Sequence, residues 1–197
     1  MARLLLFYVV LKPFVHGVLG LNVGRKDLLP RAGPAILVAN HNSHLDTLVL
    51  LSLFPYRLAK NIRPVASAEY FLSNRFLAWF VLRLLRIIPA NRAMLDGVHA
   101  ALASGEIVLL FPEGTRGEPE QLAPLQCGIA HIAKSHPDVP ITPVFIRGTG
   151  KALPRGDPVL VPFLCSVQLG EAMLWCGDKV QFMRNLERGF HELGCRR

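Results

Sequence analysis

The chain has 197 residues, of which 51% are hydrophobic, and its formal net charge at pH 7 is +8. This length fits one domain with a sizeable core, and no apolar run reaches the ~18 residues that a clear membrane span needs. The basic residues are scattered among leucines and phenylalanines, and the four cysteines form no Cys-x-x-Cys pair. Nucleic acid, a disulfide framework and a zinc site are therefore not expected, whereas anionic headgroups or phosphorylated substrates are expected partners.

The chain opens on an apolar segment, residues 4–11, which Lys12 and Pro13 follow. This segment is too short to span a bilayer, and no convincing signal-peptide cleavage site follows it. The helical pattern continues beyond Pro13 to Leu19, so a helix kinked at the proline can lie in the membrane interface. We expect residues 1–24 to form a membrane-associating segment; the alternative is a helix that packs on the protein's own core.

Beyond this segment, short apolar strands alternate with helical segments, which predicts an α/β domain over residues 25–197. A loop with breakers at Pro30, Gly33 and Pro34 precedes the first strand. Residues 158–169 combine β-forming residues with prolines, which predicts an edge strand or a hairpin. The predicted strands are residues 35–38, 62–66, 106–111 and 141–146. The predicted helices are residues 69–88, 92–104 and 126–135, followed by a last helix that Asp178 caps, with Gln181 at capping-box spacing.

The predicted helix at 69–88 is apolar nearly all round, and Arg75, Arg83 and Arg86 interrupt it. Such a helix is buried or contacts lipid. A central arginine costs ~2.5–3.5 kcal/mol on insertion scales, whereas an arginine at the interface gains about 1 kcal/mol from acidic headgroups. We therefore expect this helix to dock on an anionic bilayer without crossing it.

A polar cluster, Ala-Asn-His-Asn-Ser-His-Leu-Asp at residues 39–46, follows the predicted strand at 35–38. Active sites of open α/β sheets lie at such strand ends. His41 and Asp46 are five residues apart, so they meet only if the chain turns between them. A histidine oriented by a carboxylate is the pair that activates hydroxyl groups. Alternatively, Ser43 and Asp46 form a capping box in which the carboxylate only satisfies the start of a helix.

A second polar cluster, Phe-Pro-Glu-Gly-Thr-Arg at residues 111–116, lies at the end of another predicted strand. Gly114 permits a close backbone approach or a positive φ. Backbone N–H groups near Gly114 and Thr115 can hold an anion or an oxyanion, and Arg116 offers a planar fork for phosphate. The alternative is an ordinary turn with a solvated arginine.

Four segments in this order resemble the blocks of the glycerolipid acyltransferases, the family of the 1-acyl-glycerol-3-phosphate (lysophosphatidate) acyltransferases. The resemblance covers about residues 30–190, and the first and third blocks are the most specific. It implies a single domain with a mixed, mostly parallel sheet covered by helices, like that of the glycerol-3-phosphate acyltransferases. The blocks are Asn-His-x-Ser-x-x-Asp at 40–46, Ile-Pro-x-x-Arg at 88–92, Phe-Pro-Glu-Gly-Thr-Arg at 111–116 and Val-Pro-Ile-x-Pro-Val at 139–144.

The resemblance also implies a role for each matching residue. His41 is the general base that removes the acceptor hydroxyl proton, and Asp46 orients it. The substrate-binding residues it implies are Arg92 and Arg116 at the acceptor phosphate, Glu113, Gly114 and Thr115 around the acceptor, and Pro140 and Ile141 on the acyl side.

The implied reaction moves a fatty acyl group from a thioester, on coenzyme A or acyl carrier protein, to a hydroxyl of a lysophospholipid. The foremost acceptor is 1-acyl-sn-glycerol-3-phosphate, which would give phosphatidic acid. Attack on the thioester carbonyl is direct, with no metal, cofactor or acyl-enzyme. Such an enzyme would be a monotopic or peripheral protein at the cytoplasmic face of an anionic membrane.

Three departures from the family pattern leave the acceptor open. Residues 67–69 read Ser-Ala-Glu where many members have Lys-Lys-Glu. Gln126 stands where many members have lysine, and Asn91 precedes Arg92 where aspartate is common. Because fewer cations surround the acceptor, another lysophospholipid or another hydroxyl acceptor stays an alternative.

Three other functions are alternatives to acyl transfer: a metal hydrolase, a non-catalytic membrane-surface module and a thioesterase. A metal hydrolase would use His41, His44 and Asp46, but their spacing does not match a zinc site and the other histidines form no second cluster. A non-catalytic membrane-surface module would explain the basic, apolar helices but not why His41, Asp46, Glu113 and Arg116 are all present. A thioesterase would use the same base to activate water.

Overall fold

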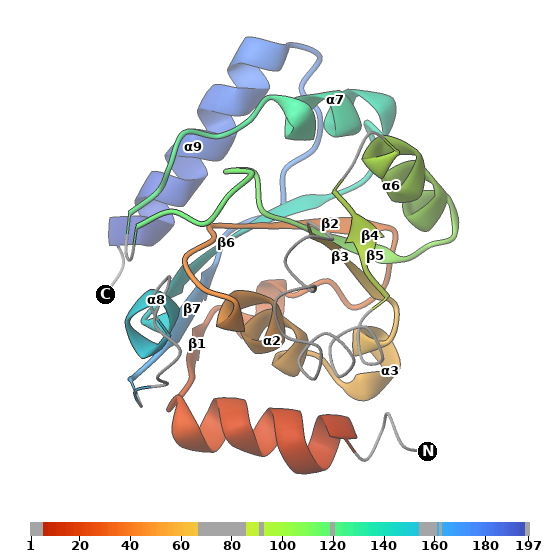
Figure 1. Cartoon of the computed structure of the whole chain (residues 1–197). Coiled ribbons are helices and arrows are strands. Elements are labelled where there is room, and N and C mark those ends of the chain that lie inside the picture. Colours follow the sequence, from red (N-terminus) through yellow and green to blue (C-terminus); the bar gives the residue numbers. More distant parts are fainter. Residues whose placement is uncertain are drawn as a thin grey trace.

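A sheet forms the middle layer of the computed structural model, with helices on both of its faces (Figure 1). The structure describes residues 6–66, 86–90, 93–118, 121–153, 161 and 163–195. Within these residues seven strands form the sheet, in the order β1-β7-β6-β2-β5-β3-β4. Their bounds are β1 Asn22–Gly24, β2 Ala35–Ala39, β3 Ile62–Ala66, β4 Ile88–Pro89, β5 Ile107–Leu110, β6 Ile141–Arg147 and β7 Ser166–Leu169.

The sheet is mixed and mostly parallel, as the resemblance implied. β2 pairs in parallel with β5 on one side and with β6 on the other, so that Val38 lies opposite both Leu110 and Pro143. β7 runs antiparallel to β6 and parallel to β1. Of the two alternatives for residues 158–169, the edge strand is wrong, because β1 pairs with the outer side of β7, and the hairpin falls partly outside the described residues.

The strands separate two hydrophobic layers because successive side chains point to opposite faces. In β2, Ala35 and Leu37 face the layer of α2, whereas Ile36 and Val38 face the layer of α6, α7 and α9. The sequence run is apolar without alternation because both faces are covered. The helices are α2 Leu45–Ser52, α3 Tyr56–Ala59, α6 Met94–Ala103, α7 Gly128–Ser135, α8 Thr149–Ala152 and α9 Lys179–Cys195, and shorter helical segments are η1 Leu6–Leu11, η2 Phe14–Val18 and η3 Lys26–Leu28.

The N-terminal helical segment, η1 and η2, lies across the outside of the α2 layer (Figure 1). Pro13 keeps helical φ and ψ angles of −59° and −39° between them. Side chains four residues apart, from Phe7 to Leu19, are buried in the core, so one face packs on the protein itself. The opposite face exposes apolar side chains, among them Tyr8 and Val9. The membrane-associating role of residues 1–24 stays a prediction.

Local signals placed the ends of several elements well. Asp178 Oδ1 accepts the N–H of Gln181 at 2.7 Å and so caps α9 as predicted.

Most of the helix predicted at 69–88, including Arg75 and Arg83, lies outside the described residues, and its last residue, Ile88, begins a strand instead. Among the residues that the structure describes, no helix combines the length and the apolar character needed to cross a membrane.

Candidate active site

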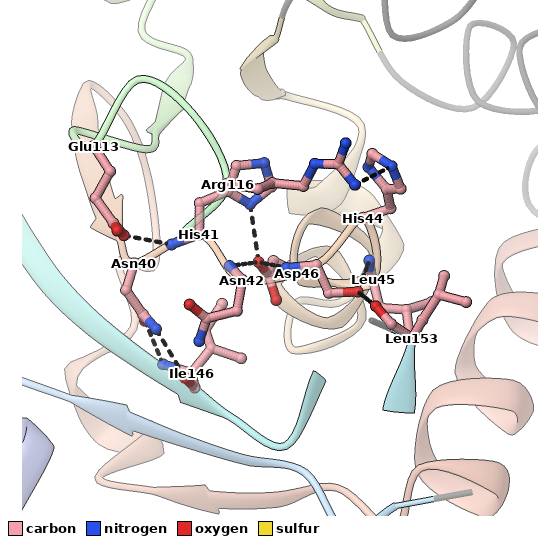
Figure 2. A network of polar contacts seen from close by, with 11 residues as sticks. Asn40, His41, Asn42, His44, Leu45, Asp46, Glu113, Arg116, Ile146 and Leu153 are labelled. Carbon is pink, nitrogen blue, oxygen red and sulfur yellow. Dashed lines mark hydrogen bonds and ion pairs between the residues drawn. The ribbon is translucent and has the colours of Figure 1, made fainter. Parts of the chain in front are cut away.

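The two polar clusters meet at the carboxyl ends of β2 and β5, which are parallel neighbours. The main-chain N–H of His41 donates to Glu113 Oε1 at 2.7 Å (Figure 2). The carbonyl of His41 accepts from Gly117 N–H at 2.9 Å. Side chains 72 residues apart in the chain therefore belong to one site. This is the position that the topology of open α/β sheets favours for an active site.

His41 and Asp46 form a hydrogen-bonded pair (Figure 2). Nδ1 of the ring lies 2.9 Å from Asp46 Oδ2, because the chain turns between the end of β2 and the start of α2. The carboxylate is fully buried, whereas 20% of the His41 side chain is exposed. An ionised carboxylate can only accept, so Nδ1 carries the proton and Nε2 is left as the basic nitrogen. The geometry is that of a histidine base held by an acid.

Asp46 also stabilises the turn that brings it to His41. Its Oδ2 accepts the backbone N–H groups of Asn42 at 2.7 Å and Ser43 at 2.8 Å. The bond to Ser43 is half of the predicted capping box; in the other half, Ser43 Oγ accepts from Leu45 N–H at 3.3 Å instead of from Asp46. The same carboxylate oxygen of Asp46 therefore caps the start of α2 and orients the ring of His41.

Phe111, the first residue of the second cluster, stacks on the ring of His41. The two ring centroids are 4.1 Å apart and the planes differ by 22°. Stacking and the bond to Asp46 together restrict the imidazole to one orientation. The sequence had assigned Phe111 no role, although it stands within the third block.

Glu113 connects the loop that contains His41 to the loop that contains Ala123 by accepting a backbone N–H from each. Its second carboxylate oxygen, Oε2, accepts the N–H of Ala123 at 2.8 Å, while Oε1 accepts from His41. Burial raises the pKa of Glu113, and the two N–H donors oppose part of that rise. In this position the carboxylate holds the His41 loop against the loop that leads to α7.

Arg116 contacts a histidine of the first cluster. Its Nη1 lies 2.6 Å from Nε2 of His44 (Figure 2). Burial first, and then the positive charge of Arg116, lower the pKa of His44 from 6.5 to about 3. The sequence had left His44 as a polar neighbour or an ordinary helix residue, and its contact with Arg116 assigns it to the site.

Asn40 fixes the end of β2 to β6. Its side-chain amide donates to the carbonyl of Ile146 at 2.9 Å and accepts from the N–H of Ile146 at 2.6 Å. Asn40 is fully buried, and the two bonds imitate a pair of ladder hydrogen bonds across 106 residues of sequence. This residue, the first of its block, was also given no role from the sequence.

The remaining predicted site residues are not all brought to this place. Gly114 has a φ of +78° and lies in the exposed turn beside Glu113, together with Thr115. Pro140 and Ile141 lie at the other end of the sheet, where Ile141 pairs with Ile36 near the start of β2. Arg92 lies outside the described residues.

The part of the chain that the structure describes contains no group of three or more His, Cys, Asp or Glu side chains that could hold a metal ion. Two of the three side chains that a metal hydrolase would need, His41 and Asp46, are hydrogen-bonded to each other, and the third, His44, contacts Arg116.

Comparisons with known proteins identify the family of this chain. The family model described as Acyltransferase matches residues 20–147, more than half of the chain. The chloroplastic 1-acyl-sn-glycerol-3-phosphate acyltransferase BAT2 of Brassica napus is 29% identical over 141 residues, which are 68% of this chain and 39% of that protein. The lyso-ornithine lipid O-acyltransferase of Rhizobium meliloti is 29% identical and covers 87% of this chain and 65% of its own length.

A solved structure shares the fold. The 1-acyl-sn-glycerophosphate (LPA) acyltransferase PlsC of Thermotoga maritima matches with a TM-score of 0.76 and 24% sequence identity, over 100% of this chain and 83% of that one. The present chain spans about two fifths of the length of the chloroplastic relatives from Brassica napus and Arabidopsis thaliana and of the relative from Chlamydomonas reinhardtii.

Proposed function

Because the chain belongs to the Acyltransferase family, we propose that it is an O-acyltransferase that moves a fatty acyl group from an acyl thioester to a hydroxyl of a lysophospholipid. The observation that carries the proposal is the bond between His41 and Asp46, which leaves Nε2 of the ring as a base at the carboxyl end of the sheet. The acyl donor is coenzyme A or acyl carrier protein. The first candidate for the acceptor is 1-acyl-sn-glycerol-3-phosphate, after which several relatives are named.

In this mechanism His41 Nε2 takes the proton of the acceptor hydroxyl while the oxygen attacks the thioester carbonyl. The imidazolium that forms is stabilised by the buried carboxylate of Asp46. When the tetrahedral intermediate collapses, the C–O bond is kept and the C–S bond breaks, and the proton on His41 passes to the leaving thiolate. General-base catalysis of this kind contributes about 10²–10⁴-fold in rate.

The acceptor headgroup is assigned to Arg116 and, from the resemblance, to Arg92. Arg116 is a planar cation in the same loop network as His41, and bidentate guanidinium contacts are well suited to phosphate. His44 positions it by accepting one of its N–H groups.

A second candidate acceptor is a lysolipid without a phosphomonoester. The relative that covers 87% of this chain is named a lyso-ornithine lipid O-acyltransferase. The absence of lysines at positions 67, 68 and 126 supports the same alternative, because a doubly charged headgroup needs more cations.

The test is a panel of lysolipids incubated with labelled acyl-coenzyme A or acyl carrier protein, with products identified by mass spectrometry. Lysophosphatidate, lysophosphatidylcholine, lysophosphatidylethanolamine and lyso-ornithine lipid should be compared. A diacyl product with the wild type and none with His41→Ala is expected. Free fatty acid formed without an acceptor would indicate a thioesterase, and no turnover by folded protein would indicate a non-catalytic membrane-surface module.

A further inference from the structure

Three apolar side chains are exposed just before β7. Val161 is 51% exposed, Phe163 is 40% exposed and Leu164 is 78% exposed. Among the described residues with large apolar side chains that are exposed, Leu164 is the most exposed. A single exposed leucine is common on protein surfaces, but a group of apolar side chains in one short loop marks an interaction site. We call these three residues the pre-β7 loop.

The pre-β7 loop is held against the end of the N-terminal helical segment. Cys165, the residue after the loop, donates its N–H to the carbonyl of Leu19 and accepts from the N–H of Asn22, both at 2.9 Å. Leu164 lies directly over Gly20, since a Cβ on that glycine would be 2.6 Å from Leu164 Cδ2. In Figure 1 the chain entering β7 accordingly lies beside the end of the N-terminal segment.

The pre-β7 loop and the N-terminal segment both expose apolar side chains. The outward face of the N-terminal segment exposes Tyr8, Val9, Val10 and Val18. Lysines lie next to the aromatic rings of both parts. Lys12 Nζ is 5.6 Å from the ring centroid of Tyr8, and Lys151 Nζ is 5.3 Å from that of Phe163. Apolar and aromatic side chains flanked by lysines suit the boundary between acyl chains and anionic headgroups.

We propose that the pre-β7 loop is a second membrane-contacting element, which inserts Phe163 and Leu164 into an anionic bilayer beside the N-terminal segment. The choice of a bilayer as partner rests on the proposed function, which requires a lipid acceptor, and on the flanking lysines of a chain with net charge +8. Two contacts separated along the chain fix the orientation of the domain on the surface, which one helix alone does not.

The pre-β7 loop is also connected to the catalytic loop. Val161 donates its N–H to the carbonyl of Ala152 at 2.8 Å, and the next carbonyl, that of Leu153, accepts from Ser43 Oγ at 3.0 Å (Figure 2). Ser43 in turn donates its N–H to Asp46. Docking through the loop therefore brings the bilayer to the α8 side of the catalytic turn.

The first test compares two double variants by flotation with vesicles of phosphatidylcholine and graded phosphatidylglycerol. Phe163→Ser with Leu164→Ser removes the apolar loop. Leu174→Ser with Val180→Ser is the matched control, since these side chains are 53% and 56% exposed, Val180 lies on α9 and Leu174 lies in the segment before it. The loop variant should lose vesicle partitioning by about tenfold or more, and the control should not. Lys151→Gln should lose about fivefold, and only on anionic vesicles.

The second test measures insertion directly. Leu164→Trp and the control Leu174→Trp carry the same two native tryptophans, so that their difference reports the new side chain. Brominated phosphatidylcholine in the vesicles should quench the fluorescence of Leu164→Trp and leave that of Leu174→Trp unchanged relative to the wild type. Equal quenching of both variants, or equal flotation of both double variants, would overturn the proposal.

Activity assays separate this proposal from the proposed function. With a short-chain lysolipid below its aggregation concentration, the loop variant should keep wild-type turnover, while turnover of acceptor embedded in vesicles falls with binding. If the wild type has no transferase activity but the loop variant still loses vesicle binding, the docking proposal is supported and the proposed function is refuted. If the loop variant instead dissociates a wild-type dimer in sedimentation and binds vesicles normally, the surface is a contact between two copies and the proposal is wrong.

Discussion

Arg116 Nη1 lies 2.6 Å from Nε2 of His44, so the guanidinium donates to a ring nitrogen that carries no proton. Arginine keeps its proton in proteins and has no acceptor, which means that this contact requires a neutral His44. Burial and the charge of Arg116 lower the pKa of His44 to about 3, and the pair is therefore maintained at neutral pH. A histidine of the first cluster thus positions the cation of the second.

His44→Gln should make the free energy of unfolding less sensitive to acid. The folded pKa of His44 lies below its unfolded value of 6.5, so between pH 6.5 and about 3 the unfolded chain binds the extra proton. The contribution of His44 is therefore present above pH 6.5 and is lost as the pH falls toward 3. Glutamine keeps an acceptor for Arg116 and does not titrate there. Urea unfolding from about pH 7 to about pH 4 measures the difference.

The control for this pH series is His131→Gln, because His131 is exposed on α7. The raised pKa of Glu113 has the opposite effect on stability, but it is present in every variant and cancels in the comparison. Parallel pH profiles for the wild type and His44→Gln would show that His44 binds its proton equally in both states.

Arg116→Lys should raise the KM for a phosphate-bearing acceptor by about tenfold and leave the KM for the acyl donor unchanged. Lysine keeps the charge but loses the planar fork that contacts phosphate. Steady-state kinetics with each substrate varied in turn gives both constants. Arg184→Lys, an exposed replacement on α9, is the control. An unchanged acceptor KM would remove Arg116 from the headgroup site.

His41→Ala should lower kcat by about 10²–10⁴-fold while the protein stays folded. The main-chain bonds of His41 to Glu113 and Gly117 do not need the side chain, and truncation removes only the stacking on Phe111 and the bond to Asp46. Turnover and thermal melting are measured together, with His131→Ala as the control. Near wild-type turnover would exclude His41 as the base.

Asp46→Asn should lower both kcat and the melting temperature. The substitution favours the wrong tautomer of His41, which costs about 10²–10⁴-fold in rate, and it weakens an acceptor that holds three donors at once. A kinetic and calorimetric comparison with the wild type separates the two effects. A lower melting temperature with full activity would mean that Asp46 only caps α2.

Asn40→Asp should lower the free energy of unfolding by about 1–3 kcal/mol, because a buried carboxylate oxygen would face the carbonyl of Ile146 where a donor is now. Urea denaturation at neutral pH provides the measurement. Asn61→Asp, at an exposed position, should change the stability little. If the two variants unfold alike, the tie between β2 and β6 does not contribute to stability.

Much of the fold followed from local patterns. The apolar runs at 35–38 and 141–146 became β2 and β6 because strands buried on both faces need apolar side chains throughout. Elements whose partners are distant were harder to predict. The short strand β1 lies at the end of the predicted N-terminal segment, where no strand was predicted, and it forms because β7 offers it a parallel partner.

For the site, local sequence patterns predicted the two polar clusters, their positions at strand ends and the meeting of His41 with Asp46 across a turn, since all of these depend on residues close together in the chain. That β2 and β5 are neighbours is visible only in the folded chain, and with it the contacts of His41 with Glu113 and Phe111, of Arg116 with His44 and of Asn40 with Ile146. The fold also places Pro140 and Ile141 at the opposite end of the sheet. The physical reason is that the order of strands in a sheet is set by long-range pairing and packing, which the spacing of residues along one segment does not encode.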